Sequence, residues 1–188
     1  MSTTKPSSNL LIALMIVSSG LLWVCFSTFN KEVFSATNFG TGIELVYLPA
    51  GFRLVIVLIF GVWGAIGIAI SNLFLVHINI GEQSALATVT NSAIAGFVPF
   101  LSVRAVQRWL GIDHNLSSLK PIHLPIFALV VSITAPLAFT IQFVSIGVTT
   151  YSDMAQSLSA MILGDFLGCL VALAILRAII ALFKTVEP

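Results

Sequence analysis

The sequence predicts an all-α integral membrane protein, a bundle of about six transmembrane helices. Composition supplies the first two observations behind this fold class. Of the 188 residues, 58% are hydrophobic and 8% are charged, and the mean hydropathy is +1.09. Soluble domains carry roughly 25% charged residues, so the 8 basic and 7 acidic side chains could not cover a water-soluble fold of this size. The length fits a single transmembrane domain over residues 1–188.

The third observation is a succession of apolar runs, since a span needs about 20 mostly apolar residues. The first run follows Lys5 and exceeds the ~7–15 residues of a signal-peptide core, so we expect a retained helix. Gly61 marks a very short turn between the second and third runs, and Pro136 predicts a kink in the fifth. The expected spans cover residues 9–29, 45–60, 61–77, 83–103, 124–149 and 154–183.

The basic residues predict the orientation of the bundle, because Lys and Arg near span ends favour the cytoplasmic side. Of the 8 basic residues, Arg53 lies inside a span and Lys31 falls on one side. The others share the opposite side, so we expect both termini to be cytoplasmic. These others are Lys5, Arg104, Arg108, Lys120, Arg177 and Lys184.

The charge pattern also bears on partners. A net charge of +1 leaves no basic surface that could neutralise phosphates, so we expect no nucleic-acid partner. The longest polar stretch, residues 104–123, falls on the cytoplasmic side. It is either a contact surface for a cytoplasmic partner or anionic lipid, or a segment that only determines topology.

Two ionisable residues, Arg53 and Asp165, fall inside expected spans, where a charge is costly. Counted from the outer ends of their spans, they lie at similar depth, so we expect them to face the bundle interior and to pair. Small residues flank both: Gly51 precedes Arg53, and Gly164 and Gly168 bracket Asp165 in a pattern that permits close helix approach. The pair is either an architectural salt bridge that locks two helices or part of a ligand site.

Other polar residues inside the expected spans also have two interpretations. They either hydrogen-bond across helices or line a polar pocket that opens to the outer side. These residues are Asn72, Asn91, Gln142 and Gln156. The three tryptophans, Trp23, Trp63 and Trp109, are interpreted as aromatic residues of the membrane interface.

Sequence patterns of catalysis are missing. The chain contains no GxSxG, no HExxH and no glycine-rich phosphate loop followed by a basic residue. His77, His114 and His123 show no metal-ligand spacing, and Cys25 and Cys169 lie in apolar runs where cysteine packs as a small hydrophobe. We therefore expect no enzyme activity, no catalytic residue, no metal ion and no cofactor.

Several short motifs resemble those of the membrane-associated sensor domains of the MASE type. Residues 47–51 (YLPAG), followed by an apolar span that ends in Gly61, resemble the opening P-x-G motif and first helix of that family. Residues 91–93 (NSA), on a span that ends in basic residues, resemble its next block. Residues 164–168 (GDFLG) resemble its closing GDxxG motif. In this order the motifs cover about residues 45–176.

The resemblance implies a multi-pass sensory module of the bacterial inner membrane, which that family usually joins to a histidine kinase or a diguanylate cyclase. This chain departs from the pattern in three respects. We expect no such output domain after Lys184. The chain also has about six expected spans where the family commonly has more, and it places Arg53 where the family is usually apolar. We therefore expect the signal to pass to a separate cytoplasmic or membrane partner.

The resulting hypothesis is a sensor-like membrane domain that binds a small anionic or zwitterionic molecule from the outer side. We expect Tyr47, Arg53, Asn91 and Asp165 to contact this ligand. Arg53 would hold the negative group of the ligand, and Asp165 would position Arg53 or meet a ligand cation.

Two alternatives stay open. In size and topology the chain is similar to the substrate-binding S-components of energy-coupling-factor vitamin transporters, which need an ATPase-bearing partner. A structural subunit of a larger membrane assembly is the other alternative, and in it the pair of Arg53 and Asp165 would be architectural.

Overall fold

The computed structural model describes residues 8–34, 47–80, 84–113, 116–147 and 150–186; the side chains of residues 34, 77–80 and 179–186 lie outside this description. Every regular element in these ranges is helical, which confirms the all-α prediction. The elements in chain order are α1 (Ser8–Phe34), α2 (Leu48–Ile80), α3 (Ala85–Leu110), the short 3₁₀ helix η2 (Pro121–His123), α4 (Leu124–Ser145) and α5 (Met154–Val186).

Five helices, α1 to α5, are long and apolar enough to cross a membrane. Only 17% to 44% of each apolar stretch is buried inside the molecule, so much of the outer surface is apolar as well. Phe74 and Leu86, for example, are 67% and 77% exposed. A water-soluble monomer rarely exposes such continuous apolar surface. The helices therefore suggest a multi-pass membrane protein.

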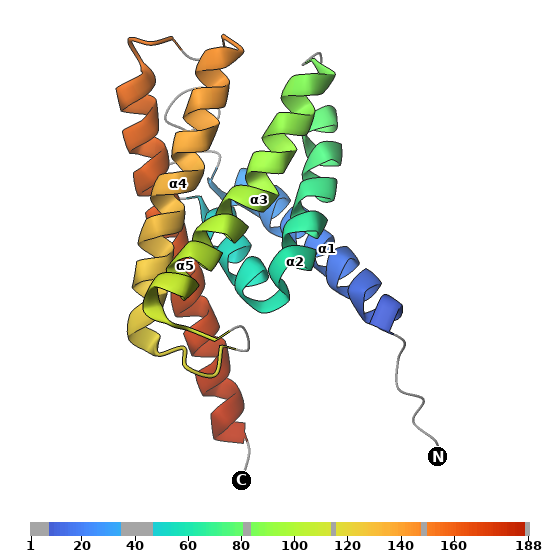
Figure 1. Cartoon of the computed structure of the whole chain (residues 1–188), viewed down its shortest axis with the longest axis vertical. Helices are drawn as coiled ribbons and strands as arrows, with labels where there is room; N and C mark the ends of the chain where they lie inside the picture. The colour runs from blue at the N-terminus through green and yellow to red at the C-terminus, as the bar shows by residue number, and fades with distance from the viewer. Residues whose placement is uncertain (1–7, 35–46, 81–83, 114–115, 148–149, 187–188) are drawn as a thin grey trace.

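The expected spans 45–60 and 61–77 form one helix, α2, that is interrupted at Gly61. Gly61 has φ 58° and ψ −133°, a non-helical conformation that glycine adopts most readily. The carbonyl oxygen of Ile56 stands 2.9 Å from the position of a Cβ on Gly64, although eight residues span about 12 Å in a straight helix. The two arms of α2, residues 48–60 and 62–80, thus meet at a sharp bend, which Figure 1 shows in teal and sea green.

The first arm of α2 is short. Residues 48–60 extend about 20 Å at the α-helical rise, whereas the hydrocarbon core of a bilayer is about 30 Å thick. The bend lies where the sequence places the turn between the second and third spans, but the first arm cannot cross a bilayer by its length alone. The number of spans, about six by sequence, stays a prediction.

Helix α3 continues beyond the expected end of its span because its stop signal lies at Gly111. Gly111 adopts the left-handed conformation, and its N–H and that of Ile112 reach back to the carbonyls of Arg108 and Gln107. The Arg104 and Arg108 side chains therefore project from the last turns of a helix and not from a loop. A change from apolar to polar composition marks a membrane surface, and a helix can continue past it.

Helix α2 is the centre of the bundle. It packs against α1, α3 and α5 and more lightly against α4, whereas α1 contacts no other described helix. In Figure 1 the starts of α1 and α4 and the ends of α3 and α5 lie toward the bottom. We call this the basic end, because Arg108, Lys120 and Arg177 belong to the segments that meet there.

Replacing Gly61 with alanine is expected to lower the free energy of unfolding by about 1–3 kcal/mol. A Cβ on Gly61 would meet no atom within 4 Å, so the loss reports the backbone conformation alone. The measurement is thermal unfolding in detergent. Gly111→Ala is the matched control: Gly111 is equally open, but its φ 64° and ψ 32° lie in the left-handed region, which L-residues tolerate better. A loss at Gly61 no larger than that at Gly111 would contradict the assignment.

Candidate functional site

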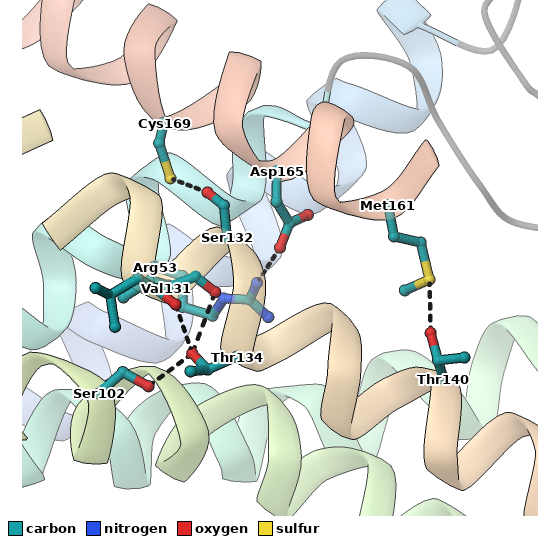
Figure 2. A network of polar contacts seen from close by, with 10 residues as sticks. Arg53, Ser102, Val131, Ser132, Thr134, Thr140, Met161, Asp165 and Cys169 are labelled. Atoms are coloured by element: carbon teal, nitrogen blue, oxygen red, sulfur yellow. Dashed lines mark hydrogen bonds and ion pairs between the residues drawn. The ribbon is translucent and has the colours of Figure 1, made fainter. Parts of the chain in front are cut away.

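Arg53 and Asp165 form an ion pair inside the bundle. The Nη2 of Arg53 donates a hydrogen bond to Oδ2 of Asp165 at 3.1 Å, and the two side chains are 2% and 9% exposed. Figure 2 shows the contact between the first arm of α2 and helix α5. The pairing predicted from their depths is thus confirmed.

Glycines allow these two helices to approach closely. A Cβ on Gly51 would collide with the backbone of α5 at Gly168, and a Cβ on Gly168 would collide with the carbonyl of Tyr47. The N–H of Tyr47 also donates to the carbonyl oxygen of Gly164 at 3.1 Å. The small residues that bracket Asp165 therefore form the surface on which the start of α2 rests.

Two aromatic rings complete the surroundings of the guanidinium. The Cζ of Arg53 lies 5.7 Å from the ring centroid of Trp23 on α1 and 5.9 Å from that of Phe139 on α4. Both distances are within the range of cation–π attraction. Nε of Arg53 is buried and has no hydrogen-bond partner among the described residues. One carboxylate and two rings thus replace the water that would otherwise solvate Arg53.

Trp23 also begins a chain of polar contacts across three helices. Its Nε1 donates to Oδ1 of Asn72 on the second arm of α2 at 3.3 Å, and Nδ2 of Asn72 donates to Oδ1 of Asn91 on α3 at 3.0 Å. Asn72 and Asn91 thus hydrogen-bond across helices, as one interpretation of the sequence expected. Trp23, which the sequence suggested as an interfacial aromatic residue, has a side chain that is only 2% exposed. The indole covers Arg53, and its N–H needs a buried acceptor.

Asn30, which the sequence places in a connecting segment, caps helix α2 from outside. Its Oδ1 accepts a hydrogen bond from the N–H of Leu48 at 2.9 Å. The first N–H groups of a helix have no acceptor within the helix, and an asparagine oxygen is a favourable substitute. Here the asparagine comes from α1, so helix α2 can begin inside the bundle. Ser19, Trp23 and Asn30, the three buried residues of α1, share one face at spacings of four and seven residues, a signal that the sequence offered.

A pocket of about 340 Å³ opens beside this cap. We call it the α1–α2 pocket, since its walls are the end of α1, Tyr47, and the last turns of α2. The hydroxyl of Ser27 is buried there and has no hydrogen-bond partner in the described structure. Lys31 and Glu32 are exposed and line the same pocket. The lining residues are Trp23, Ser27, Thr28, Lys31, Glu32, Tyr47, Asn72, Leu75 and Val76.

The structure connects the four predicted ligand residues but places only one in this pocket. Tyr47 lines the pocket. Asn91 lies one hydrogen bond behind its wall, through Asn72. Arg53 lies behind the ring of Trp23, and Asp165 lies behind Arg53. Ligand contact by these residues stays a prediction.

Further polar contacts tie α3, α4 and α5 together. The hydroxyls of Ser102 and Thr134 are 2.7 Å apart, and the hydroxyl of Ser132 donates to the sulfur of Cys169 at 3.7 Å (Figure 2). Nε2 of Gln142 donates to the carbonyl oxygen of Ala87 at 2.8 Å. These contacts are architectural, because each joins two helices and none lines the α1–α2 pocket.

Within the described ranges, no group of three or more His, Cys, Asp or Glu side chains could hold a metal ion. Comparisons of the chain with protein-family models, with curated proteins and with solved structures found no match. The resemblance to MASE-type sensors and the likeness to transporter S-components therefore stay hypotheses.

A double-mutant cycle tests the coupling of Arg53 and Asp165. Arg53→Met and Asp165→Leu are each expected to lower the free energy of unfolding by about 3–5 kcal/mol, because each leaves the other charge buried and unpaired. The double variant should lose clearly less than the sum of the two. The readout is thermal or denaturant unfolding in detergent.

The control cycle combines Asp165→Leu with Arg104→Met. Arg104 lies on α3, and α3 does not contact α5 in the described structure. The losses of unfolding free energy caused by Asp165→Leu and Arg104→Met should therefore add to within about 0.5 kcal/mol in the double variant. Equal additivity in the cycle of Arg53 and Asp165 would show that the two residues are not coupled.

Proposed function

We propose that the chain is a multi-pass membrane receptor that binds a small zwitterionic molecule in the α1–α2 pocket and passes the signal to a separate protein. One observation carries this proposal: a pocket with a buried, unpartnered serine hydroxyl at its wall and side chains of both charges along it. A buried polar atom without a partner is costly. A ligand gains affinity if its binding gives it access to the Ser27 hydroxyl and it supplies the missing partner.

The lining of the pocket supports a small ligand with two opposite charges. Its volume of about 340 Å³ is at the lower end of the range for ligand pockets. Lys31 can meet a negative group, and Glu32 can meet a positive one. Trp23, Leu75 and Val76 offer apolar surface to the body of the ligand. This combination favours a zwitterion over a simple anion.

The position of the pocket supplies a route for the signal. Helix α1 contacts only α2 among the described helices, so no third described helix fixes its position. A ligand that draws the end of α1 toward Tyr47 would also move Trp23 against Arg53. Binding can shift the equilibrium only if the ligand prefers one arrangement of α1. In this proposal the ion pair of Arg53 and Asp165 is the fixed point against which α1 moves.

We place the protein in the bacterial inner membrane with the basic end in the cytoplasm. The cluster of Arg108, Lys120 and Arg177 supports this orientation. The pocket lies toward the opposite end of α1, so its ligand would come from the outer side.

Cysteine labelling tests the orientation. In a Cys25→Ala background, since Cys25 is exposed, single cysteines replace Ser118 or Ser152, which are exposed at opposite ends of the bundle. An impermeant maleimide should label intact cells that carry Ser152→Cys, and should label Ser118→Cys only after permeabilisation. The reverse pattern would overturn the orientation, and labelling of both in intact cells would place both ends outside.

Ligand binding is tested with matched compounds: amino acids, the corresponding amines without the carboxylate, and the corresponding acids without the amine. A zwitterion at a hundred times its Kd should raise the Tm by about 5–10 °C, and more than its matched amine or acid. Ser27→Ala should weaken binding about 2- to 12-fold, the worth of one hydrogen bond. It should leave the Tm of the free protein unchanged or higher, because the hydroxyl has no partner to lose.

Three variants complete this test. Ser18→Ala is the control, because its hydroxyl bonds the carbonyl of Met15 and does not line the pocket. Lys31→Gln should weaken the binding of zwitterions and acids only, and Glu32→Gln that of zwitterions and amines only. The proposal fails if no compound raises the Tm of the wild type, or if Ser27→Ala and Ser18→Ala bind every active compound equally.

A further inference from the structure

A second hollow lies at the basic end, between the start of α4 and the C-terminal half of α5. It is a groove of about 560 Å³ with an almost wholly apolar lining. We call it the α4–α5 groove. Its lining residues are Pro121, Leu124, Pro125, Leu170, Leu173, Ala174, Leu176 and Arg177.

The α4–α5 groove begins next to a hydrogen-bonded contact between α4 and α5. The two helices are joined where the hydroxyl of Ser132 meets the sulfur of Cys169. The groove begins at the next residue of α5, Leu170, and on the α4 side it reaches Pro121 in the 3₁₀ turn. It therefore runs along the surface of the bundle, where Leu170 is 38% exposed, toward the basic end, and an apolar groove of this kind can hold a hydrocarbon chain.

The depth of Arg177 places a cation at the outer edge of this groove. From Met154 to Arg177, helix α5 extends about 35 Å, slightly more than the ~30 Å of a bilayer's hydrocarbon core. Leu170, Leu173 and Ala174 then lie beside acyl chains, while the exposed guanidinium of Arg177 lies at headgroup level.

We propose that the α4–α5 groove is a binding site for one anionic phospholipid. An acyl chain fills the apolar part, and Arg177 binds the headgroup. A guanidinium forms two parallel hydrogen bonds to a phosphate, and the net negative charge of the lipid distinguishes it from zwitterionic lipids. This site depends on the membrane residence proposed above but not on the α1–α2 pocket.

Native mass spectrometry of the full chain tests the site, with phosphatidylglycerol and phosphatidylcholine of identical acyl chains as probes. The wild type should retain one phosphatidylglycerol with about fivefold preference over phosphatidylcholine, the effect of one basic residue near the membrane surface. Arg177→Gln should remove the preference. Arg108→Gln, a basic residue at the same end that does not line the groove, should keep it.

The apolar part of the site needs its own variants. Ala174→Phe should reduce retention of both lipids by filling the groove, and the milder Ala174→Leu should reduce it in part if the larger residue impairs folding. Inorganic phosphate should not displace the bound lipid, since it cannot use the groove. Equal retention of the two lipids by the wild type, an equal effect of Arg177→Gln and Arg108→Gln, or displacement by phosphate would overturn the proposal.

Discussion

A guanidinium inside a bundle of apolar helices requires a carboxylate in contact, and for Arg53 that carboxylate is Asp165 on the last helix. The contact forms only if the backbones of α2 and α5 nearly touch, which is why Gly51 and Gly168 face each other. It also requires that α2 begin beside Gly164, inside the bundle. A helix can start there only if an acceptor replaces water at its first N–H groups, and Asn30 of α1 supplies it.

The α1–α2 pocket lies beside the start of the short first arm of α2. Helix α2 starts inside the bundle and turns back at Gly61, so its last turns return to the end of α1 and form one wall of the pocket. The same geometry that brings Arg53 to Asp165 thus leaves a cavity one tryptophan ring away from the ion pair.

The ion pair could be predicted from the sequence because a charge inside a span is costly, and Arg53 and Asp165 are opposite charges at matching depth. The sequence also located the turn at Gly61, since a glycine within an apolar run often marks a break in the helix. The expected span 45–60 holds 16 residues, fewer than the roughly 20 that a span needs, so the sequence already carried a signal that the first arm is too short to cross a bilayer by itself. The roles of Trp23 and Asn30 were not predicted from the sequence. Their partners, Asn72 and the N–H of Leu48, lie on another helix, and an aromatic or polar residue near a span end is more often interfacial.

Two partners of Arg53 are synthesised at different times: Trp23 precedes it in the chain, and Asp165 follows it. Arg53 and Asp165 are separated by 112 positions, which a ribosome covers in roughly 6–20 s at 5–20 residues per second. During that interval Arg53 has been synthesised and Asp165 has not. Helix α1 and its Trp23 have already been made, so the indole face is available to the cation from the first moment. Of these two contacts of Arg53, the one with Trp23 therefore joins the residues that are synthesised first.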